Sequence, residues 1–217
     1  MDAQLRKIST EDIPLVHHWC AQSVFWEMCP GASQGRTADF SLEKEAWLAS
    51  RLLEQGSCGF NLVHERPGVA PIRAVATILF CPGSLAPGAV VLPTAPASDD
   101  AYLLSSLHID PVIAHTGLEA VLVDAVIMEL MSKNVSAVEA FAFRPDFVED
   151  PGAPLPEDLR VISRGVDRIG MISCEILQAA GFYVHVDHPL FPRLRLDLPP
   201  KRGLLLAKEV EELVLQN

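Results

Sequence analysis

The stretch that decides the fold is Tyr102–Lys133, YLLSSLHIDPVIAHTGLEAVLVDAVIMELMSK. Its apolar first part, Tyr102–Ile109, predicts a strand that ends at the turn Asp110-Pro111, because proline cannot donate to a strand ladder. A short polar loop then opens at Gly117 into a helix rich in leucine and valine. Such a strand–loop–helix unit directs unpaired backbone N–H groups and the positive end of the helix dipole at one point. The stretch therefore predicts an anion site, for which phosphate is the usual ligand.

Two motifs in this stretch are Leu104-Ser-Ser-Leu107-His-Ile109-Asp-Pro111 and Ala114-His-Thr-Gly117-Leu118-Glu119-Ala120. They resemble the fourth strand and the pyrophosphate loop of the GNAT superfamily of N-acetyltransferases. Downstream, Ile176–Phe182 is similar to the helix of that family that ends in Gly-Phe, and Leu5–Leu15 is similar to its opening strand and first helix. The resemblance implies an α/β (α+β) fold with a mixed, mostly antiparallel central sheet flanked by helices. The alternation of strands and helices supports the same fold class independently.

The resemblance implies an acyltransferase that moves an acetyl group from acetyl-coenzyme A, as cosubstrate, to an amine of a small-molecule or peptide acceptor. The strand end would bond the thioester and the pantetheine arm, which lies in a gap where two strands splay apart, and the loop would hold the pyrophosphate. The family pattern has Gln or Arg at the position of Ala114 and Gly or Ala at that of Glu119, so the loop departs from it twice. The predicted cofactor-binding residues are Leu107, His108, Ile109, Ala114, His115, Thr116, Gly117, Leu118 and Glu119.

No residue is assigned to catalysis. The resemblance places a general base near Leu103 and a general acid at Leu177, and neither leucine can move a proton. Catalysis by positioning, with water relaying the proton, remains open. The alternatives are a non-catalytic protein of this fold that binds acyl-coenzyme A or a partner, and a dimerisation domain whose groove is plugged. The nearby polar candidates, each with an ordinary structural interpretation, are Tyr102, His108, Glu139 and Cys174.

The histidines do not predict a metal site. His17 and His18 are adjacent in a helix expected to run to about residue 21, so their side chains would point about 100° apart and could not chelate together. On a strand, His185 and Asp187 would share one face while His188 points to the other. The sequence therefore predicts no metal.

Three arginines, Arg160, Arg164 and Arg168, recur every four residues. If they are helical they form one basic stripe, which could hold phosphate in place of the missing loop arginine. Because the protein is acidic and Gly165 would interrupt the helix, we favour a solvated arginine face instead. The net charge of −11 argues against nucleic acid or an anionic membrane as a partner. A homodimer is possible.

We expect a single domain over residues 1–217, in the cytoplasm. Five scattered cysteines without a C-x-x-C pair indicate reduced thiols, and neither a signal peptide nor a membrane-spanning run is recognised. Proline-rich insertions are expected near 82–99, mainly as a surface loop, and near 144–157.

The remaining predicted elements flank this centre. Ser9–Asp12 opens a first helix and Ser41 a second, which would turn Leu42, Leu48 and Leu53 towards the core. A later helix is in place by Asp167 and ends at Gly181. The predicted strands are 3–8, 59–65, 72–80, 135–143, 182–187 and 194–198, and a C-terminal helix is predicted near 203–215.

Overall fold

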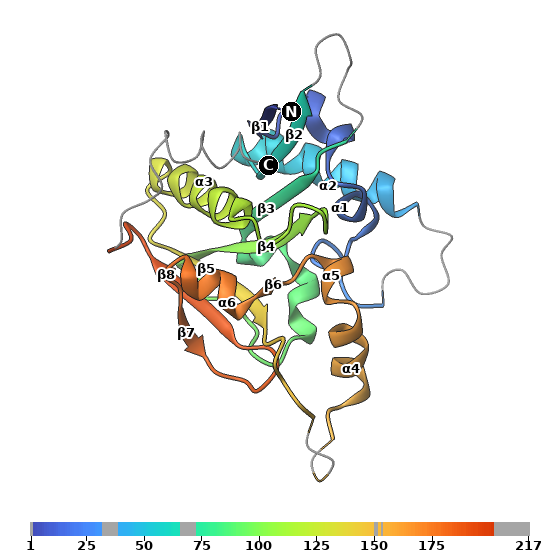
Figure 1. Cartoon of the computed structure of the whole chain (residues 1–217), viewed down its shortest axis with the longest axis vertical. Coiled ribbons are helices and arrows are strands. Elements are labelled where there is room, and N and C mark those ends of the chain that lie inside the picture. Colours follow the sequence, from blue (N-terminus) through green and yellow to red (C-terminus); the bar gives the residue numbers. More distant parts are fainter. Residues whose placement is uncertain (1, 32–38, 66–72, 150–151, 153, 202–217) are drawn as a thin grey trace.

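The computed structural model describes residues 2–31, 39–65, 73–149, 152 and 154–201. Eight strands form one sheet in the order β1-β2-β3-β4-β5-β8-β7, with β6 beside β5 (Figure 1). Among the described strands, only the pairs β4–β5 and β5–β6 are parallel, so the predicted mixed, mostly antiparallel sheet is confirmed. The strands are β1 (Asp2–Lys7), β2 (Gly59–Glu65), β3 (Ala76–Pro82), β4 (Ala101–Ile109), β5 (Ala137–Phe143), β6 (Ile172–Ser173), β7 (Tyr183–Val186) and β8 (Arg193–Asp197).

Helices flank the sheet. The α-helices are α1 (His18–Gln22), α2 (Phe40–Gln55), α3 (Leu118–Ser132), α4 (Glu157–Arg164), α5 (Val166–Ile169) and α6 (Cys174–Ala179). Three short 3₁₀ helices are η1 (Thr10–Leu15), η2 (Gly83–Leu85) and η3 (Pro87–Val91). Among the described residues, no helix has the length and apolarity needed to cross a membrane. The predicted C-terminal helix lies outside the described residues.

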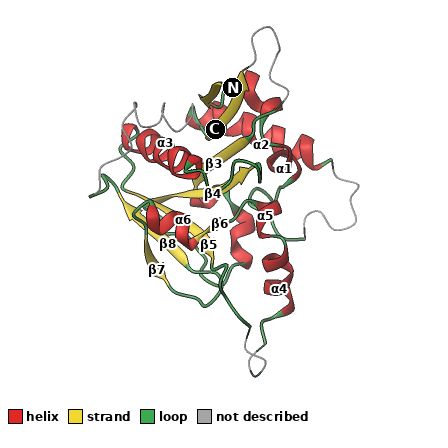
Figure 2. Cartoon of the chain, in the orientation of Figure 1, coloured by secondary structure: helices red, strands yellow, loops and turns green. Residues whose placement is uncertain are grey.

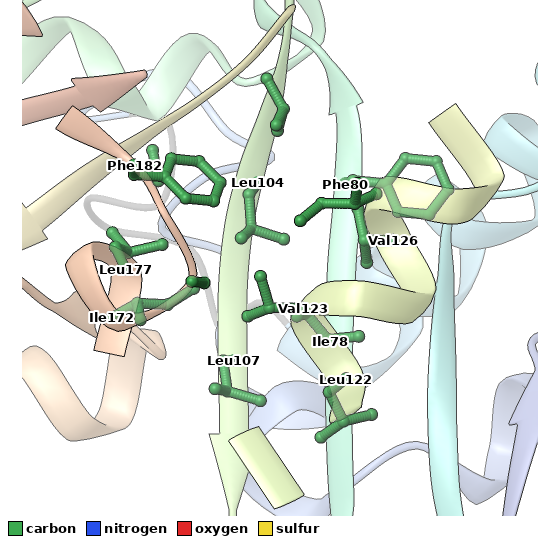
Figure 3. Packing of buried hydrophobic residues seen from close by; sticks show 14 of the residues in the cluster. Ile78, Phe80, Leu104, Leu107, Leu122, Val123, Val126, Ile172, Leu177 and Phe182 are labelled. Carbon is green, nitrogen blue, oxygen red and sulfur yellow. The ribbon is translucent and has the colours of Figure 1, made fainter. Parts of the chain in front are cut away.

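The main core lies between α3, α6 and one face of the sheet (Figure 1). In Figure 3, Leu122 and Val126 of α3 lie against β3 and β4, while Leu177 and Phe182 close the other side of β4. An apolar side chain of this size contributes roughly 1.5–3 kcal/mol when it is fully buried. The helix that the sequence predicts after Gly117 is therefore held mainly by this apolar contact.

A β-bulge in β4 sets which of its side chains reach this core. The pairing with β3 shifts between Leu79 and Phe80, so that Leu79 faces Ser106 and Phe80 faces Leu104. The extra residue is Ser105 of β4, because it has no partner between the pairs Leu79–Ser106 and Phe80–Leu104. The bulge explains why Leu104 and Leu107, three apart, both belong to the main core.

The opposite face of β4 and β5 is covered by the two proline-rich insertions. Ala89 and Leu92 of the first insertion pack with Leu103 of β4, Phe141 of β5 and Leu159 of α4. The expectation of a surface loop over residues 82–99 was wrong, because its alanines and leucines bury against an apolar sheet face. The insertion includes two 3₁₀ helices rather than lacking regular structure.

Two predicted helices are interrupted. The first is split into η1 and α1, with His17 between them in an extended conformation (φ −47°, ψ 140°). The helix expected to run to Gly181 is instead α4, α5 and α6, separated by Gly165 and by the short strand β6 (Figure 2). In both cases tertiary contacts of the interrupting residues outweigh the local tendency to continue a helix.

Helix α2 begins one residue before the predicted Ser41 but buries a different face. Leu42 and Leu53 are 65% and 88% exposed, whereas Leu48 is fully buried. The buried stripe also contains Lys44 and Arg51, at helical spacing from Leu48. The Lys44 ammonium lies 2.6 Å from a carboxylate oxygen of Glu27, and both side chains are nearly inaccessible. An apolar pattern alone could not find this face, because two of its members are charged.

Candidate functional site

The strands β4 and β5 separate at their carboxyl ends. They pair in parallel only over Ala101–Leu103 and Ala137–Glu139. Beyond that point β5 pairs with β6, and the Leu107 N–H of β4 donates to the Gly170 carbonyl at 2.8 Å. The segment 170–173 of the chain therefore lies between the two splayed strands and is hydrogen-bonded to both.

A cavity of about 440 Å³ opens beside this splay. One wall is the end of β4 with the following loop, and the other is the end of β5 with the start of α6. Of the predicted cofactor-binding residues, Thr116, Gly117 and Leu118 do not line the cavity. Those that do are Leu107, His108, Ile109, Ala114, His115 and Glu119.

The loop before α3 has the predicted turn but is already occupied by a carboxylate. Gly117 caps α3 with a φ of 93°, the left-handed conformation that glycine adopts at little cost. Glu119 is buried, and its Oε1 accepts a hydrogen bond from the His115 N–H at 2.6 Å. The Thr116 and Gly117 N–H groups have no acceptor among the described residues. One amide of the predicted phosphate loop thus binds the chain's own anion, and others remain open.

The charge around the cavity is negative. Glu119, Asp167 and Glu175 contribute carboxylates, and no lysine or arginine is among the described residues that line it. This is the reverse of what a polyanionic ligand prefers. The wall is otherwise largely apolar, with Trp19 and Phe143 among its aromatic members.

The predicted arginine stripe is broken but partly faces a second cavity. Gly165 separates Arg160 and Arg164 on α4 from Arg168 on α5. Arg160 and Arg164 line a cavity of about 460 Å³ that shares Phe143 with the first. Arg160 is paired with carboxylates, at 3.0 Å from Glu149 and 3.2 Å from Glu157. Arg164 has no ion pair with a described residue.

His108 is the most strongly perturbed group at the site. It is 1% exposed, and its Nε2 lies 3.1 Å from the Arg168 carbonyl, which fixes the proton on Nε2. Its Nδ1 has no hydrogen-bond partner among the described residues. Burial lowers the pKa of His108 to about 3, although the bond to Arg168 opposes this. The ring is therefore neutral at physiological pH, with one proton on Nε2, and does not take up a second proton at Nδ1.

The other candidates for proton transfer lie away from the cavity or are held by neighbours. Glu139 is fully buried in an ion pair with Arg193 and accepts hydrogen bonds from Ser98. Cys174 is buried, which raises its thiol pKa to about 11. Tyr102 lies at the other end of β4, in a cavity with residues 97–101. Leu103 and Leu177, at the expected base and acid positions, are fully buried core residues.

Known proteins resemble this chain in fold but not detectably in sequence. No protein-family model matches the chain, and neither does any curated protein sequence. Solved structures do match. An N-acetyltransferase from Staphylococcus aureus Mu50 is 13% identical, with a TM-score of 0.50 over 91% of this chain and 99% of its own. The chain has the GNAT N-acetyltransferase fold.

Two further structures with this GNAT fold were solved with coenzyme. The yncA protein of Salmonella typhimurium, with its cofactor acetyl-CoA, is 14% identical with a TM-score of 0.50, covering 95% of this chain and all of its own. The PaiA N-acetyltransferase of Thermoplasma acidophilum, in complex with coenzyme A, is 11% identical with a TM-score of 0.50, covering 91% and 99%. At these identities the likeness concerns the fold, and the site depends on this chain's own residues.

One side-chain cluster near the end of β4 contradicts the sequence prediction. His17 is fully buried and precedes α1, so it does not share a helix with His18. The ring centroids of the two histidines are 4.4 Å apart, and one ligand atom from each, with one from Asp110, lies within 4.8 Å of the others. The expectation that the two histidines diverge was wrong because it assumed continuous helical geometry. Pro14, two residues before Val16, was the signal that the first helix ends early.

Proposed function

We propose that this chain is an acyltransferase that moves an acetyl group from acetyl-coenzyme A to an amine. The observation that carries the proposal is the cavity at the splay of β4 and β5. Residues predicted from the sequence to contact the coenzyme line it from both ends of the motif, Leu107 and Glu119 among them. The open N–H groups of the α3 amino terminus, with the positive end of the helix dipole, favour an anionic group there.

The chemistry needed from the chain is mainly positioning. The amine nitrogen attacks the thioester carbonyl, a carbon–nitrogen bond forms, the carbon–sulfur bond breaks, and the thiolate leaves. The amine proton passes to the thiolate through water, because a His108 with a pKa of about 3 cannot hold it. The thioester is already activated, so a positioned amine attacks without a strong base.

Coenzyme binding would displace internal contacts. A pantetheine arm along β4 competes with Gly170 for the Leu107 N–H, and a pyrophosphate competes with Glu119 for the His115 N–H. These two contacts favour a second candidate function, a non-catalytic protein of the GNAT fold. Its cavity would take a ligand or a partner segment, with the coenzyme groove partly filled by the chain itself.

The test is calorimetric titration of the full chain with acetyl-coenzyme A, followed by thiol release in the presence of a panel of amines. Ala114→Trp fills the cavity, whereas Val112→Trp places the same side chain on a residue that is 91% exposed and lies outside the cavity. Glu119→Ala frees the His115 N–H and removes a buried negative charge, so it should tighten coenzyme binding about tenfold.

Three outcomes separate the candidates. Binding that Ala114→Trp abolishes and Val112→Trp preserves, with thiol release from at least one amine, supports the acyltransferase. Such binding without release from any amine supports the non-catalytic candidate. If neither the wild type nor Glu119→Ala binds at millimolar coenzyme, both coenzyme-dependent candidates fail and only a partner-binding role for the fold survives.

A further inference from the structure

We propose that His17, His18 and Asp110 bind a divalent transition-metal ion of the zinc class. Two histidines and one carboxylate are a donor set typical of zinc sites that keep a coordination position open. The three side chains come from the start of α1 and the end of β4, which the fold brings together. This inference is independent of the acyltransferase proposal.

The geometry already approaches that of a metal site. One ligand atom from each residue lies within 4.8 Å of the other two, and His17 Nε2 is 3.0 Å from Asp110 Oδ1. Zinc–ligand bonds of about 2.0–2.2 Å require donor atoms a little more than 3 Å apart. A small rotation of the exposed His18 side chain is therefore enough to bring its nitrogen to the same point.

Two of the three ligands are held in place by other contacts. The His17 ring is fully buried and stacks on the His108 ring, with centroids 6.0 Å apart. The Asp110 backbone donates to the Val75 carbonyl at 2.8 Å and accepts hydrogen bonds from the next turn of the loop. The His18 side chain makes no hydrogen bond to a described residue and contacts only the rings of His17 and Trp19 among the described aromatic residues. The fold thus already orders two of the three ligands, which lowers the entropy lost when an ion binds.

The hydrogen bonds of His17 determine which of its ring nitrogens faces the proposed ion. The Trp19 N–H donates to His17 Nδ1 at 3.3 Å, which leaves the proton on Nε2, facing Asp110. An ion would replace this proton on Nε2. The proton would move to Nδ1, and the hydrogen bond from the Trp19 N–H to Nδ1 would break. That exchange lowers the affinity below that of a site with a built hydrogen-bond acceptor behind the histidine.

The proposed metal site can be reached from solvent and lies beside the cavity. The Asp110 side chain is 37% exposed and His18 is exposed, so an ion can enter from solvent. Trp19 and Pro111, the sequence neighbours of His18 and Asp110, line the 440 Å³ cavity. The proposed ion therefore lies at the rim of that cavity.

The experiment is titration of chelator-treated full chain with Zn²⁺, monitored by calorimetry, together with the visible absorption of bound Co²⁺. Each test variant removes one ligand with little risk to folding, namely His18→Ala at an exposed position and Asp110→Asn with the shape of the side chain retained. His185→Ala is the matched control, because this histidine is similarly accessible, at 36% exposed, and lies on β7. All proteins carry Cys29→Ser, which removes the exposed thiol as a competing ligand.

We expect one Zn²⁺ per chain in the wild type and the His185→Ala control. Each ligand variant should weaken binding at least tenfold and remove the Co²⁺ absorption, while its melting temperature without metal matches that of the parent. The proposal is overturned if the parent binds no Zn²⁺, or if either ligand variant binds it as tightly as the parent does.

Discussion

His108 shows how burial decides what a single polar residue can do. The sequence presents it as a candidate for proton transfer at the end of the central strand. In the fold it is covered by α5 and Gly170, its Nε2–H donates to Arg168, and burial lowers its pKa to about 3. The residue cannot act as a base, and this depends on a contact with a residue 60 positions away in the chain.

The lowered pKa of His108 predicts a loss of stability in acid. The unfolded ring titrates near pH 6.5 and the folded ring near pH 3, so between these values the unfolded state binds more protons. The free energy of unfolding should therefore fall as the pH drops below 6.5, by up to about 1.4 kcal/mol per pH unit. Urea denaturation at several pH values measures this slope.

His108→Gln provides the control, because its amide can still donate to Arg168 but does not titrate. Its slope should be shallower than that of the wild type, with the remainder due in part to His17, whose pKa burial also lowers. If the free energy of unfolding falls equally steeply with pH in the wild type and His108→Gln, the loss of stability in acid is not due to His108.

At the scale of elements, the segment from α5 to β6 occupies the space between the separated ends of β4 and β5. It runs between the splayed strands and is bonded to Leu107 on β4 and to the end of β5. Trp26 adds a third attachment, with its Nε1–H donating to the Ile169 carbonyl at 2.8 Å. The sequence pattern predicts one helix through this region. Gly165 and Gly170 do not reveal from the sequence alone that the chain turns there to lie against other strands.

Gly170 is the residue that allows the segment to lie this close to β4. Its φ is +67°, and a Cβ atom built there would come within 2.5 Å of the His108 ring. Gly170→Ala should therefore lower the free energy of unfolding by about 3 kcal/mol, from backbone strain and overpacking together. Chemical denaturation measures the change.

The matched control for this change is Gly165→Ala, five residues earlier. Its φ is −112°, and the nearest atoms to a built Cβ are 3.7 Å away, so the alanine should change stability by less than about 1 kcal/mol. If both variants lose the same stability, close packing of Gly170 on His108 is not the reason for the glycine.

Across the whole molecule, the buried carboxylate of Glu139 connects parts that are far apart in sequence. It sits on β5 and binds Ser98 at the end of the first insertion and Arg193 and Arg195 on β8. Arg193 also donates to the Thr94 carbonyl at 3.0 Å. Burial opposes ionisation of Glu139, but the hydrogen bonds from Ser98 and the pairing with Arg193 hold its pKa below the usual value.

Glu139→Gln should destabilise the fold by about 3 kcal/mol, because it leaves the buried Arg193 without its counter-ion. It should also speed proteolytic cleavage within the first insertion, which Ser98 and Thr94 anchor. Denaturation and limited proteolysis measure the two effects. Glu149→Gln, which removes an exposed carboxylate paired with Arg160, should change both much less. Similar effects in the two variants would show that the network does not anchor the insertion.

The sequence by itself determined the sheet, the central strand–loop–helix unit and the fold class. The strands predicted at 59–65 and 102–109 and the helix after Gly117 are present, with the second strand beginning one residue earlier. They were predictable because alternating or continuous apolar runs and a helix-capping glycine act over a few residues. Most of the predicted coenzyme contacts meet at one cavity for the same reason, since they lie along one short stretch of chain.

Only the tertiary structure decided what fills and surrounds that cavity. Four features join residues from distant parts of the chain. They are the burial of the first insertion, the charged inner face of α2, the hydrogen bond from the Leu107 N–H to the Gly170 carbonyl and the contact of His17 with Asp110. Local patterns could not predict them, because each depends on which side chains compete for the same buried space and the same hydrogen-bond partners. The physical reason is that burial and hydrogen-bond satisfaction are properties of the packed molecule, whereas strand and helix tendencies are properties of the chain.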